Sequence, residues 1–283
     1  MKHFRQYVRA ATEDEAVSLR KTLGAKALYI AGGPTVVPVA SKSVEVLIDI
    51  SRLGLDGVRV EDESVSAGAT TKLAALLHPQ VRSAVPLLGR ALRRCATPLI
   101  RNMATLGGSL AGIFLPSDVA VALLALGADI EIRSDGVRVV AADQLLARGW
   151  LKSPELIRRV TVRRLKPGEG ASFFKVARGE VDIALVDVAA AVSVSEDAKI
   201  ERLKVAVGQT LSLPVLLTDI ADEARVSKIS HDLIENLAVL VSERVKPKSD
   251  FRASSDYRKH LIRVLAARSI LAAVAEAGVE LES

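Results

Sequence analysis

The last third of the sequence constrains the fold most strongly, because strand-forming runs come first there and helical patterns follow. Apolar runs cover 171–176, 181–194 and 200–207, with a charged turn at 196–199. Residues 232–245 and 256–277 then carry apolar side chains mostly at helical spacing. Strands grouped before helices are typical of α+β proteins. We therefore expect an antiparallel sheet followed by two helices.

The first 165 residues alternate between helical and strand patterns. Thr12 and Glu15 form a capping box that starts a helix ending at Gly24. The pattern predicts strands at 27–30, 44–50 and 157–162, hairpins at 57–68 and 128–140, and helices at 71–77, 81–96 and 119–126. A Pro/Gly-rich charged stretch at 166–170 indicates a domain boundary. We expect domains at 1–167, in two parts divided near residue 55, and at 168–283.

Composition narrows the classes of partner. The chain has 283 residues, 49% of them hydrophobic, and a net charge of +6. Its basic residues are spread out and rarely alternate with aromatic ones, so we expect no nucleic-acid partner; an acidic subunit or an anionic cofactor explains the charge equally well. The single cysteine, Cys95, excludes an internal disulfide and a cluster held by several thiolates of this chain. No run of about 18 apolar residues and no signal core is present, so we expect a cytoplasmic protein without a membrane span.

Two glycine pairs are candidate phosphate-binding turns. Gly107 and Gly108 lie between Thr105 and Ser109 in a segment that we expect to be a turn, and Gly32–Gly33 follows an apolar run. Glycine permits positive φ and close approach of a ligand, and consecutive N–H groups in such turns bind phosphate oxygens. The two pairs together suggest one long phosphate-bearing ligand held from two sides. Each pair is also compatible with a plain turn, and neither matches a P-loop or G-x-G-x-x-G.

Asp118 has two possible roles. It occupies the position expected for the N-cap of the helix at 119–126, and its carboxylate could also accept hydrogen bonds from ligand hydroxyls. One residue could do both, because the start of a helix would hold it rigidly. His78 is expected to be a helix-end residue and Cys95 a core residue.

Four blocks, in order, extend over almost the whole chain: AGGPTVV at 31–37, IRNMATLGGS at 100–109, KVARGEVDIALV at 175–186 and FRASSDYRKHL at 251–261. They resemble A-G-G-T-D-L, I-R-N-x-x-T-I-G-G-N, K-x-x-R-x-x-x-D-I-A-x-V and R-x-S-x-x-Y-R-x-x-L of the FAD-binding medium subunits of molybdenum hydroxylases. This group contains xanthine dehydrogenase and aerobic carbon monoxide dehydrogenase.

The resemblance implies a fold, a cofactor and a set of binding residues. The fold is α+β: a two-part FAD-binding domain of the vanillyl-alcohol-oxidase (PCMH) type, then a domain of antiparallel sheet plus helices. The cofactor is FAD, and the resemblance implies neither a catalytic residue nor a metal ligand in this chain. The residues expected to contact FAD are Ile30, Ala31, Gly32, Gly33, Pro34, Thr35, Val36, Thr105, Leu106, Gly107, Gly108, Ser109, Asp118, Ile157 and Lys175.

The resemblance also implies a role in electron transfer. Electrons would pass from a molybdopterin-binding large subunit through a 2Fe-2S small subunit to FAD, and then to an external acceptor. Pro34–Thr35 replaces the Thr-Asp of the family, and proline has no N–H to offer a phosphate. A degenerate structural or assembly subunit that has lost flavin is therefore an alternative. A self-contained flavin oxidase is a third hypothesis, but no carboxylate or histidine cluster accompanies the two glycine pairs.

Overall fold

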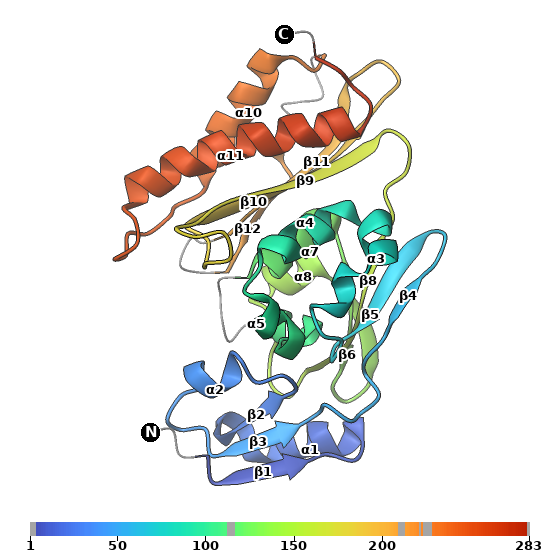
Figure 1. Cartoon of the computed structure of the whole chain (residues 1–283), viewed down its shortest axis with the longest axis vertical. Coiled ribbons are helices and arrows are strands. Elements are labelled where there is room, and N and C mark those ends of the chain that lie inside the picture. The colour runs from blue at the N-terminus through green and yellow to red at the C-terminus, as the bar shows by residue number, and fades with distance from the viewer. Residues whose placement is uncertain (1–3, 112–116, 209–212, 221, 223–227, 282–283) are drawn as a thin grey trace.

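The computed structural model describes residues 4–111, 117–208, 213–220, 222 and 228–281. Three sheets lie one after another along the longest axis of the molecule, each with its own helices (Figure 1). The first sheet is parallel, in the order β1 (Gln6–Arg9), β3 (Val46–Asp49), β2 (Ala27–Ile30). Helix α1 (Glu13–Leu23) and the 3-10 turn η1 (Gly24–Lys26) connect β1 to β2, and the short helix α2 (Val36–Val39) follows β2.

The middle sheet has five antiparallel strands. Their order is β4 (Val58–Val60), β5 (Ser64–Gly68), β8 (Leu156–Arg163), β6 (Asp129–Arg133) and β7 (Val137–Ala141). Its core is covered by the helical elements η2 (Ala75–Leu77), α3 (Pro79–Ala84), α4 (Pro86–Arg94), α5 (Pro98–Met103), α6 (Leu106–Leu110), α7 (Asp118–Leu126) and α8 (Ala142–Ala147). Helix α7 lies at the centre of this core. Eight of its nine residues are buried: Asp118 and the seven apolar residues that follow it.

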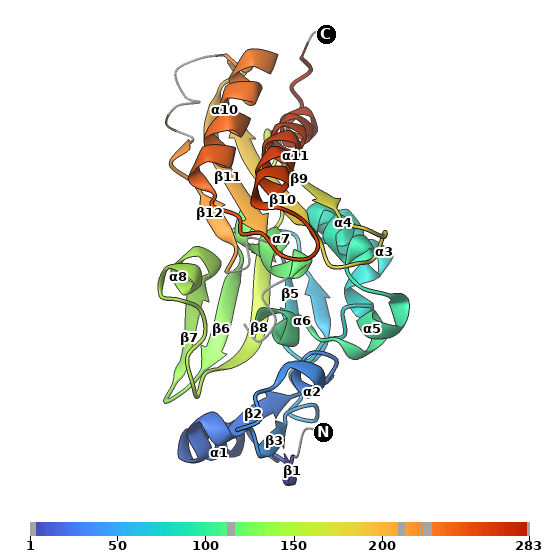
Figure 2. The same ribbon diagram turned by 90° about the vertical axis from the view of Figure 1, so that its left-hand side faces the viewer.

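The last sheet is packed on both faces. Its antiparallel order is β12 (Val215–Leu217), β11 (Ile200–Gly208), β10 (Val186–Val194), β9 (Glu169–Val176). Helices α10 (His231–Arg244) and α11 (Ser255–Glu276) cover one face, whereas α4 and α7 contact the other (Figures 1 and 2). Alternate residues of the strands therefore enter different cores: Ala189 packs with the middle core and Val188 with that of α10 and α11. This doubly buried arrangement explains the nearly continuous apolar run in β10.

Most sequence predictions of elements are confirmed. The antiparallel sheet followed by two helices is present, as are both hairpins and the strand at 27–30. The Thr12 cap is confirmed, since Thr12 Oγ1 accepts from the Glu15 N–H at 3.1 Å. The Glu15 carboxylate reaches back as expected, but it accepts from the Ala11 N–H at 2.7 Å rather than from the Thr12 N–H of a capping box. No helix in the described ranges is both long and apolar enough to cross a membrane.

Three predictions of elements are wrong in part. The helix expected at 81–96 is two helices, because Pro86 begins α4 and disfavours helical backbone at Val85, where φ is −136°. The helix expected at 71–77 is reduced to the single turn η2. The strand expected from 181 begins only at Val186, since its partner β9 ends at Val176 and leaves the earlier residues without a strand to pair with.

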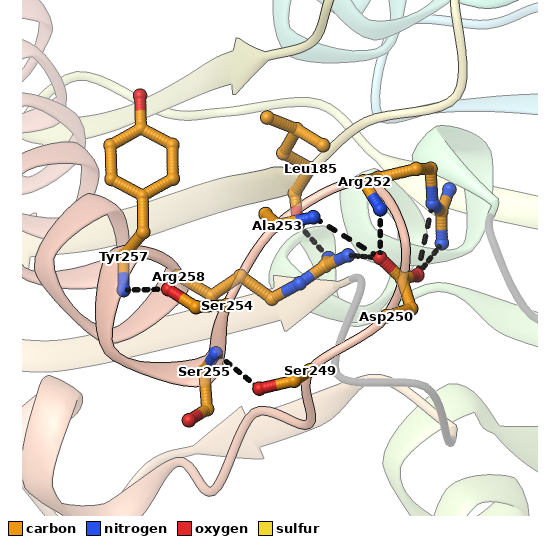
Figure 3. A network of polar contacts seen from close by, with 9 residues as sticks. All are labelled: Leu185, Ser249, Asp250, Arg252, Ala253, Ser254, Ser255, Tyr257 and Arg258. Carbon is orange, nitrogen blue, oxygen red and sulfur yellow. Dashed lines mark hydrogen bonds and ion pairs between the residues drawn. The ribbon is translucent and has the colours of Figure 1, made fainter.

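A polar network fastens the start of α11 to the sheet (Figure 3). The Arg258 side chain is fully buried, and its guanidinium donates to the Leu185 carbonyl at 2.5 Å and to Asp250 Oδ1 at 2.7 Å. Arg252 donates to Asp250 Oδ2 at 2.7 Å, and Ser254 caps α11 by accepting from the Tyr257 N–H. Three residues of the fourth block of the sequence resemblance, Arg252, Ser254 and Arg258, therefore join the start of α11 to Asp250 and to the residue before β10.

Candidate functional site

A cavity forms where three segments that are distant in sequence meet. They are the loop between β2 and α2, the helix α6, and the segment that leads into β8. The structure therefore brings the two glycine pairs of the sequence together in one cavity wall. The described residues that line it are Tyr29, Ala31, Gly32, Gly33, Pro34, Thr35, Val36, Ile50, Ala69, Ala104, Thr105, Gly107, Gly108, Ser109, Ala111, Leu151, Glu155, Leu156 and Ile157.

The loop after β2 has the geometry of an anion-binding turn. Gly33 has φ of +85°, a conformation that L side chains rarely adopt. In the described part of the chain, the N–H groups of Gly32, Gly33, Thr35 and Val36 have no hydrogen-bond partner. Free N–H groups in a turn with a left-handed residue are suited to phosphate oxygens. Pro34 contributes no donor, as the sequence predicted. The residues on both sides of it still offer their N–H groups, so the set of donors remains.

Gly32 is required by packing rather than by a ligand. A Cβ atom placed on Gly32 would lie 1.9 Å from the Met103 carbonyl oxygen at the end of α5. The absence of a side chain lets the first loop approach α5 directly. This contact links the parallel sheet to the helices that precede α6, and so fixes the two halves of the cavity relative to each other.

The turn expected at the second glycine pair is instead the helix α6, with Thr105 as its N-cap. Neither Gly107 nor Gly108 has positive φ, so the expectation of a left-handed turn there was wrong. The first N–H groups of the helix are already occupied: Leu106 donates to Thr71 O, Gly107 to Ala69 O at 2.8 Å, Gly108 to Thr105 Oγ1 and Ser109 to Thr105 O. Helical hydrogen bonding and packing against the Ala69 segment therefore consume the donors that a turn would have exposed.

The two glycines of α6 have different environments. Gly107 is buried, and a Cβ there would lie 2.7 Å from Ala69 Cβ and 3.0 Å from Ala69 O. Gly108 is exposed and lines the cavity, and a Cβ there would meet only Thr105 Oγ1, at 2.9 Å. Gly107 thus permits close packing of α6, whereas Gly108 keeps its wall of the cavity free of a side chain.

A charged network supports the third segment of the cavity wall, which leads into β8. Arg148 donates two hydrogen bonds of 2.7 Å to Glu155, and the Lys152 N–H donates to the same carboxylate at 2.8 Å. Burial acts to raise the pKa of Glu155, but these hydrogen bonds and the nearby Arg138 outweigh it and hold the pKa below its usual value. Tyr29 donates its hydroxyl proton to Pro154 O at 2.7 Å. These contacts position Leu156 and Ile157 at the cavity.

Asp118 does not cap α7. The N-cap is Ser117, whose Oγ accepts from the Ala120 N–H at 3.2 Å, and Asp118 is the first helical residue. The Asp118 carboxylate instead accepts from Lys175 Nζ at 2.8 Å, and both side chains are buried. Burial raises the pKa of Asp118, and the Lys175 ammonium acts in the opposite direction. Lys175, which is 57 positions away in the sequence, therefore orients the Asp118 side chain, and local capping rules do not take such a distant partner into account.

Four of the expected contact residues lie outside the described cavity wall: Ile30, Leu106, Asp118 and Lys175. Leu106 is buried in the middle core. Asp118 is connected to the wall by its neighbour Ser117, whose Oγ donates to the Ser109 carbonyl at 2.9 Å. Residues 112–116, which follow the second glycine pair in the sequence, lie outside the described residues. Sequence reasoning missed several lining residues, of which Glu155 and Leu156 could have been found from their position next to Ile157.

The described wall fits the expected FAD at its pyrophosphate. No Lys or Arg is among its described residues, so the free N–H groups of the first loop and the hydroxyls of Thr35 and Thr105 are the donors for phosphate. The Ser109 hydroxyl already donates to the Thr105 carbonyl at 3.1 Å. The small side chains at 104–111 leave apolar surface for the rest of a ligand. The described residues form no group of three or more His, Cys, Asp or Glu that could hold a metal ion.

Comparisons with known proteins agree with this geometry. Residues 2–163 match the family model described as "FAD binding domain in molybdopterin dehydrogenase", and residues 171–273 match "CO dehydrogenase flavoprotein C-terminal domain". The chain is 32% identical to the glyceraldehyde dehydrogenase medium chain of Sulfolobus acidocaldarius, covering 92% of this chain and 94% of the relative. It is also 32% identical to subunit alpha of the 6-hydroxypseudooxynicotine dehydrogenase complex of Paenarthrobacter nicotinovorans, covering 95% and 94%.

The same family appears among solved structures. A chain of carbon monoxide dehydrogenase from Hydrogenophaga pseudoflava superimposes with a TM-score of 0.90 and 25% identity, covering 98% of this chain and 99% of that one. The two family models together cover most of the sequence and both parts of the fold. The protein therefore belongs to the family of FAD-binding medium subunits of the molybdenum hydroxylases, and is an oxidoreductase subunit whose cofactor is FAD.

Proposed function

We propose that this chain relays electrons through its FAD within a molybdenum hydroxylase complex. In this proposal, electrons arrive from a molybdopterin-binding large subunit through a 2Fe-2S small subunit and leave to an external acceptor. The observation that carries the proposal is the single cavity lined by both glycine-containing segments, with four free N–H groups on one side. Bound FAD supplies the ability to take up electrons in pairs or singly and to pass them on.

The residues of the chain bind and shield the cofactor in this proposal. The first loop holds the pyrophosphate through the N–H groups of Gly32, Gly33, Thr35 and Val36, while Gly108 allows close approach from α6. Glu155 and its arginine partners keep the wall at Leu156 and Ile157 in place and exclude water there. Asp118 and Lys175 lie outside the described cavity wall, next in sequence to Ser117, which is bonded to Ser109 of that wall, and are proposed to meet the flavin side of the ligand.

Exposed apolar side chains next to the cavity support docking of a partner subunit there. Leu99 and Met103 of α5 are 76% and 49% exposed, and Val37 of α2 is 46% exposed. Helices α5 and α2 both adjoin the contact between Gly32 and Met103. Apolar surface of this kind beside a site is typical of surfaces that another chain covers. The division of this subunit into domains at 1–167 and 168–283 is part of the same proposal.

The experiment that tests the relay uses the purified chain and its partner subunits. The chain alone should contain FAD, seen as flavin absorption and identified after release by heat. A dithionite-reduced 2Fe-2S small subunit, freed of excess reductant, should bleach this flavin under anaerobic conditions. Substrates of the assembled complex, added to the chain alone, should leave the flavin oxidised.

Each alternative has its own signature in this experiment. A well-folded chain that neither contains nor takes up FAD would support the structural-subunit hypothesis and contradict the relay. Direct bleaching by a substrate, without any partner, would support a self-contained oxidase. Flavin that stays oxidised in the presence of the reduced small subunit would also overturn the relay.

A further inference from the structure

Three ionisable side chains are buried together between α7 and the last sheet. Lys175 of β9 and Asp187 of β10 are direct cross-strand neighbours, and the middle core, which includes α7, packs on their face of the sheet. Asp118 of α7 completes the group. Lys175 Nζ donates to Asp118 Oδ2 and to the Arg94 carbonyl, both at 2.8 Å. The described residues thus provide a cluster of two carboxyl groups and one ammonium group.

Asp187 is the unusual member of this cluster. Its side chain is fully buried, and neither carboxyl oxygen receives a hydrogen bond from an N–H or O–H group of the described residues. The Asp118 carboxyl group, which shares Lys175 as a neighbour, acts on the ionisation of Asp187. On its other side, a Cβ at the cross-strand neighbour Gly208 would lie 2.1 Å from Asp187 Oδ1, so glycine leaves the room that this carboxyl group occupies.

The charges of the cluster balance only if one carboxyl group keeps its proton. Two carboxylates and one ammonium would leave a net negative charge inside the protein, where an unpaired charge is strongly unfavourable. Among the described residues, Arg94 at the end of α4 acts on Asp118, and the Cys95 thiol that follows it is affected by the cluster and by Arg101 of α5. The neighbour of Asp187 on β11 is Gly208, which carries no charge. Burial raises the pKa of Cys95 to about 12, so this thiol is neutral.

The proton belongs on Asp187 rather than on Asp118. Burial raises the pKa of Asp187 well above its usual value, and the neighbouring Asp118 carboxylate adds to the effect. Asp118, in contrast, has Lys175 within 2.8 Å to stabilise its charge. A carboxylic acid beside a carboxylate also gives a partner to one of the two otherwise unpaired Asp187 oxygens, because the acid donates its single proton and the carboxylate accepts.

We propose that Asp187 is a positioning residue: its carboxylic acid donates a hydrogen bond to Asp118 and thereby holds the Asp118–Lys175 pair in place beside the FAD site. The inference rests on the proposed role of this pair in meeting the flavin. Loss of the Asp187 proton to solvent puts two carboxylates in contact and draws Lys175 between them. The Asp118–Lys175 pair then shifts. Because Asp118 is next to Ser117, whose Oγ bonds to Ser109 of the cavity wall, FAD affinity falls as pH rises.

Two substitutions of Asp187 separate the proton from the shape of the side chain. Asp187→Asn keeps an N–H donor toward Asp118 and cannot ionise, whereas Asp187→Leu keeps the branched shape, is larger and has no donor. Asp182→Asn is the matched control, because Asp182 is an exposed aspartate of the same segment. The measurements are urea unfolding of the FAD-free proteins and the FAD dissociation constant, both between pH 5 and 10.

The expected results follow from proton linkage. Wild-type Asp187 retains its proton when folded and loses it when unfolded, so rising pH should favour unfolding of the wild type. The ratio of the unfolding constants of wild type and Asp187→Asn should increase up to tenfold per pH unit, until Asp187 ionises in the folded state. Asp187→Asn should bind FAD within about twofold of the wild type at pH 7 and lose the alkaline weakening. Asp187→Leu should bind FAD at least about tenfold more weakly, as expected for loss of a buried hydrogen bond to a charged group.

The unfolding measurement and the FAD-binding measurement together distinguish failure of this inference from failure of the proposed function. Parallel unfolding profiles for the wild type and Asp187→Asn from pH 5 to 10 would show that Asp187 is not protonated in the folded state. Unchanged FAD affinity in Asp187→Leu would show that it positions nothing at the site. If no form of the protein binds FAD, the proposed function fails, while the unfolding profiles still decide the state of Asp187.

Discussion

The two glycines of α6 should respond oppositely to the same substitution, valine. Gly107 is packed on the Ala69 segment, and the first added atom would lie 2.7 Å from Ala69 Cβ, about 1 Å inside the usual carbon–carbon contact. The Gly107 N–H donates to Ala69 O at 2.8 Å, so α6 cannot move away without losing this hydrogen bond. Overpacking of this kind reduces the free energy of unfolding by about 1–3 kcal/mol, and loss of the hydrogen bond adds about 1 kcal/mol. We expect Gly107→Val to reduce it by about 3 kcal/mol.

Gly108→Val should leave the fold nearly intact and remove FAD binding. Its Cβ would press only on Thr105 Oγ1, so the folding penalty is limited to the Thr105 cap, about 1 kcal/mol. The rest of the side chain would occupy the cavity that Gly108 lines. We expect the FAD dissociation constant to rise at least about tenfold, which corresponds to about 1.4 kcal/mol. The physical reason is obstruction of the ligand, since Gly108 does not have positive φ.

The assay compares the two variants and the wild type after removal of FAD. Urea unfolding of the FAD-free proteins measures fold stability without the contribution of bound ligand. Fluorescence titration with FAD then measures affinity in the folded proteins. Wild-type affinity in Gly108→Val would refute the assignment of this glycine to the ligand cavity. Equal losses of stability in both variants would refute the distinction between a packing glycine and a cavity glycine.

Three further predictions concern the network at the start of α11 and the supports of the site. Asp250→Asn should reduce the free energy of unfolding at pH 7 by about 2 kcal/mol, because the fully buried Arg258 loses its ionised partner. Arg252 holds the pKa of Asp250 well below its usual value, so this difference, measured by urea unfolding, should be full above about pH 4 and vanish as pH falls through the folded pKa. Ser117→Ala should reduce the free energy of unfolding by about 1 kcal/mol through loss of the α7 cap, whereas Ser117→Thr should keep a capping hydroxyl; equal losses of stability in these two variants, measured by urea unfolding, would contradict the capping assignment. Gly32→Ala should separate the first loop from α5, because its Cβ would lie 1.9 Å from Met103 O. Its stability loss should be about 3 kcal/mol or more, with loss of FAD, and a fully FAD-loaded Gly32→Ala protein would contradict this packing role.

The sequence by itself determined the local elements and the family. Helix starts at Thr12 and strands such as 27–30 depend on residues within a few positions, which capping and periodicity rules describe. The grouping of strands before helices likewise predicted the α+β class of the last part, because each element must cover the apolar face of another. The four motif blocks identified the flavin subunit family, since their order and spacing are carried by the chain itself.

Only the tertiary structure decided what the individual site residues do. Gly32 and Gly107 are glycines because Met103 and Ala69 approach them from other segments, and no local rule contains those distances. Asp118 pairs with Lys175 instead of capping its helix, and Asp187 shares this buried cluster only because strand register and α7 bring the three residues together. The first glycine pair offers free N–H groups and the second does not, although the two look alike in sequence. Hydrogen-bond partners and close contacts between distant segments are properties of the packed chain, and they separate a structural glycine or carboxylate from one that serves the ligand.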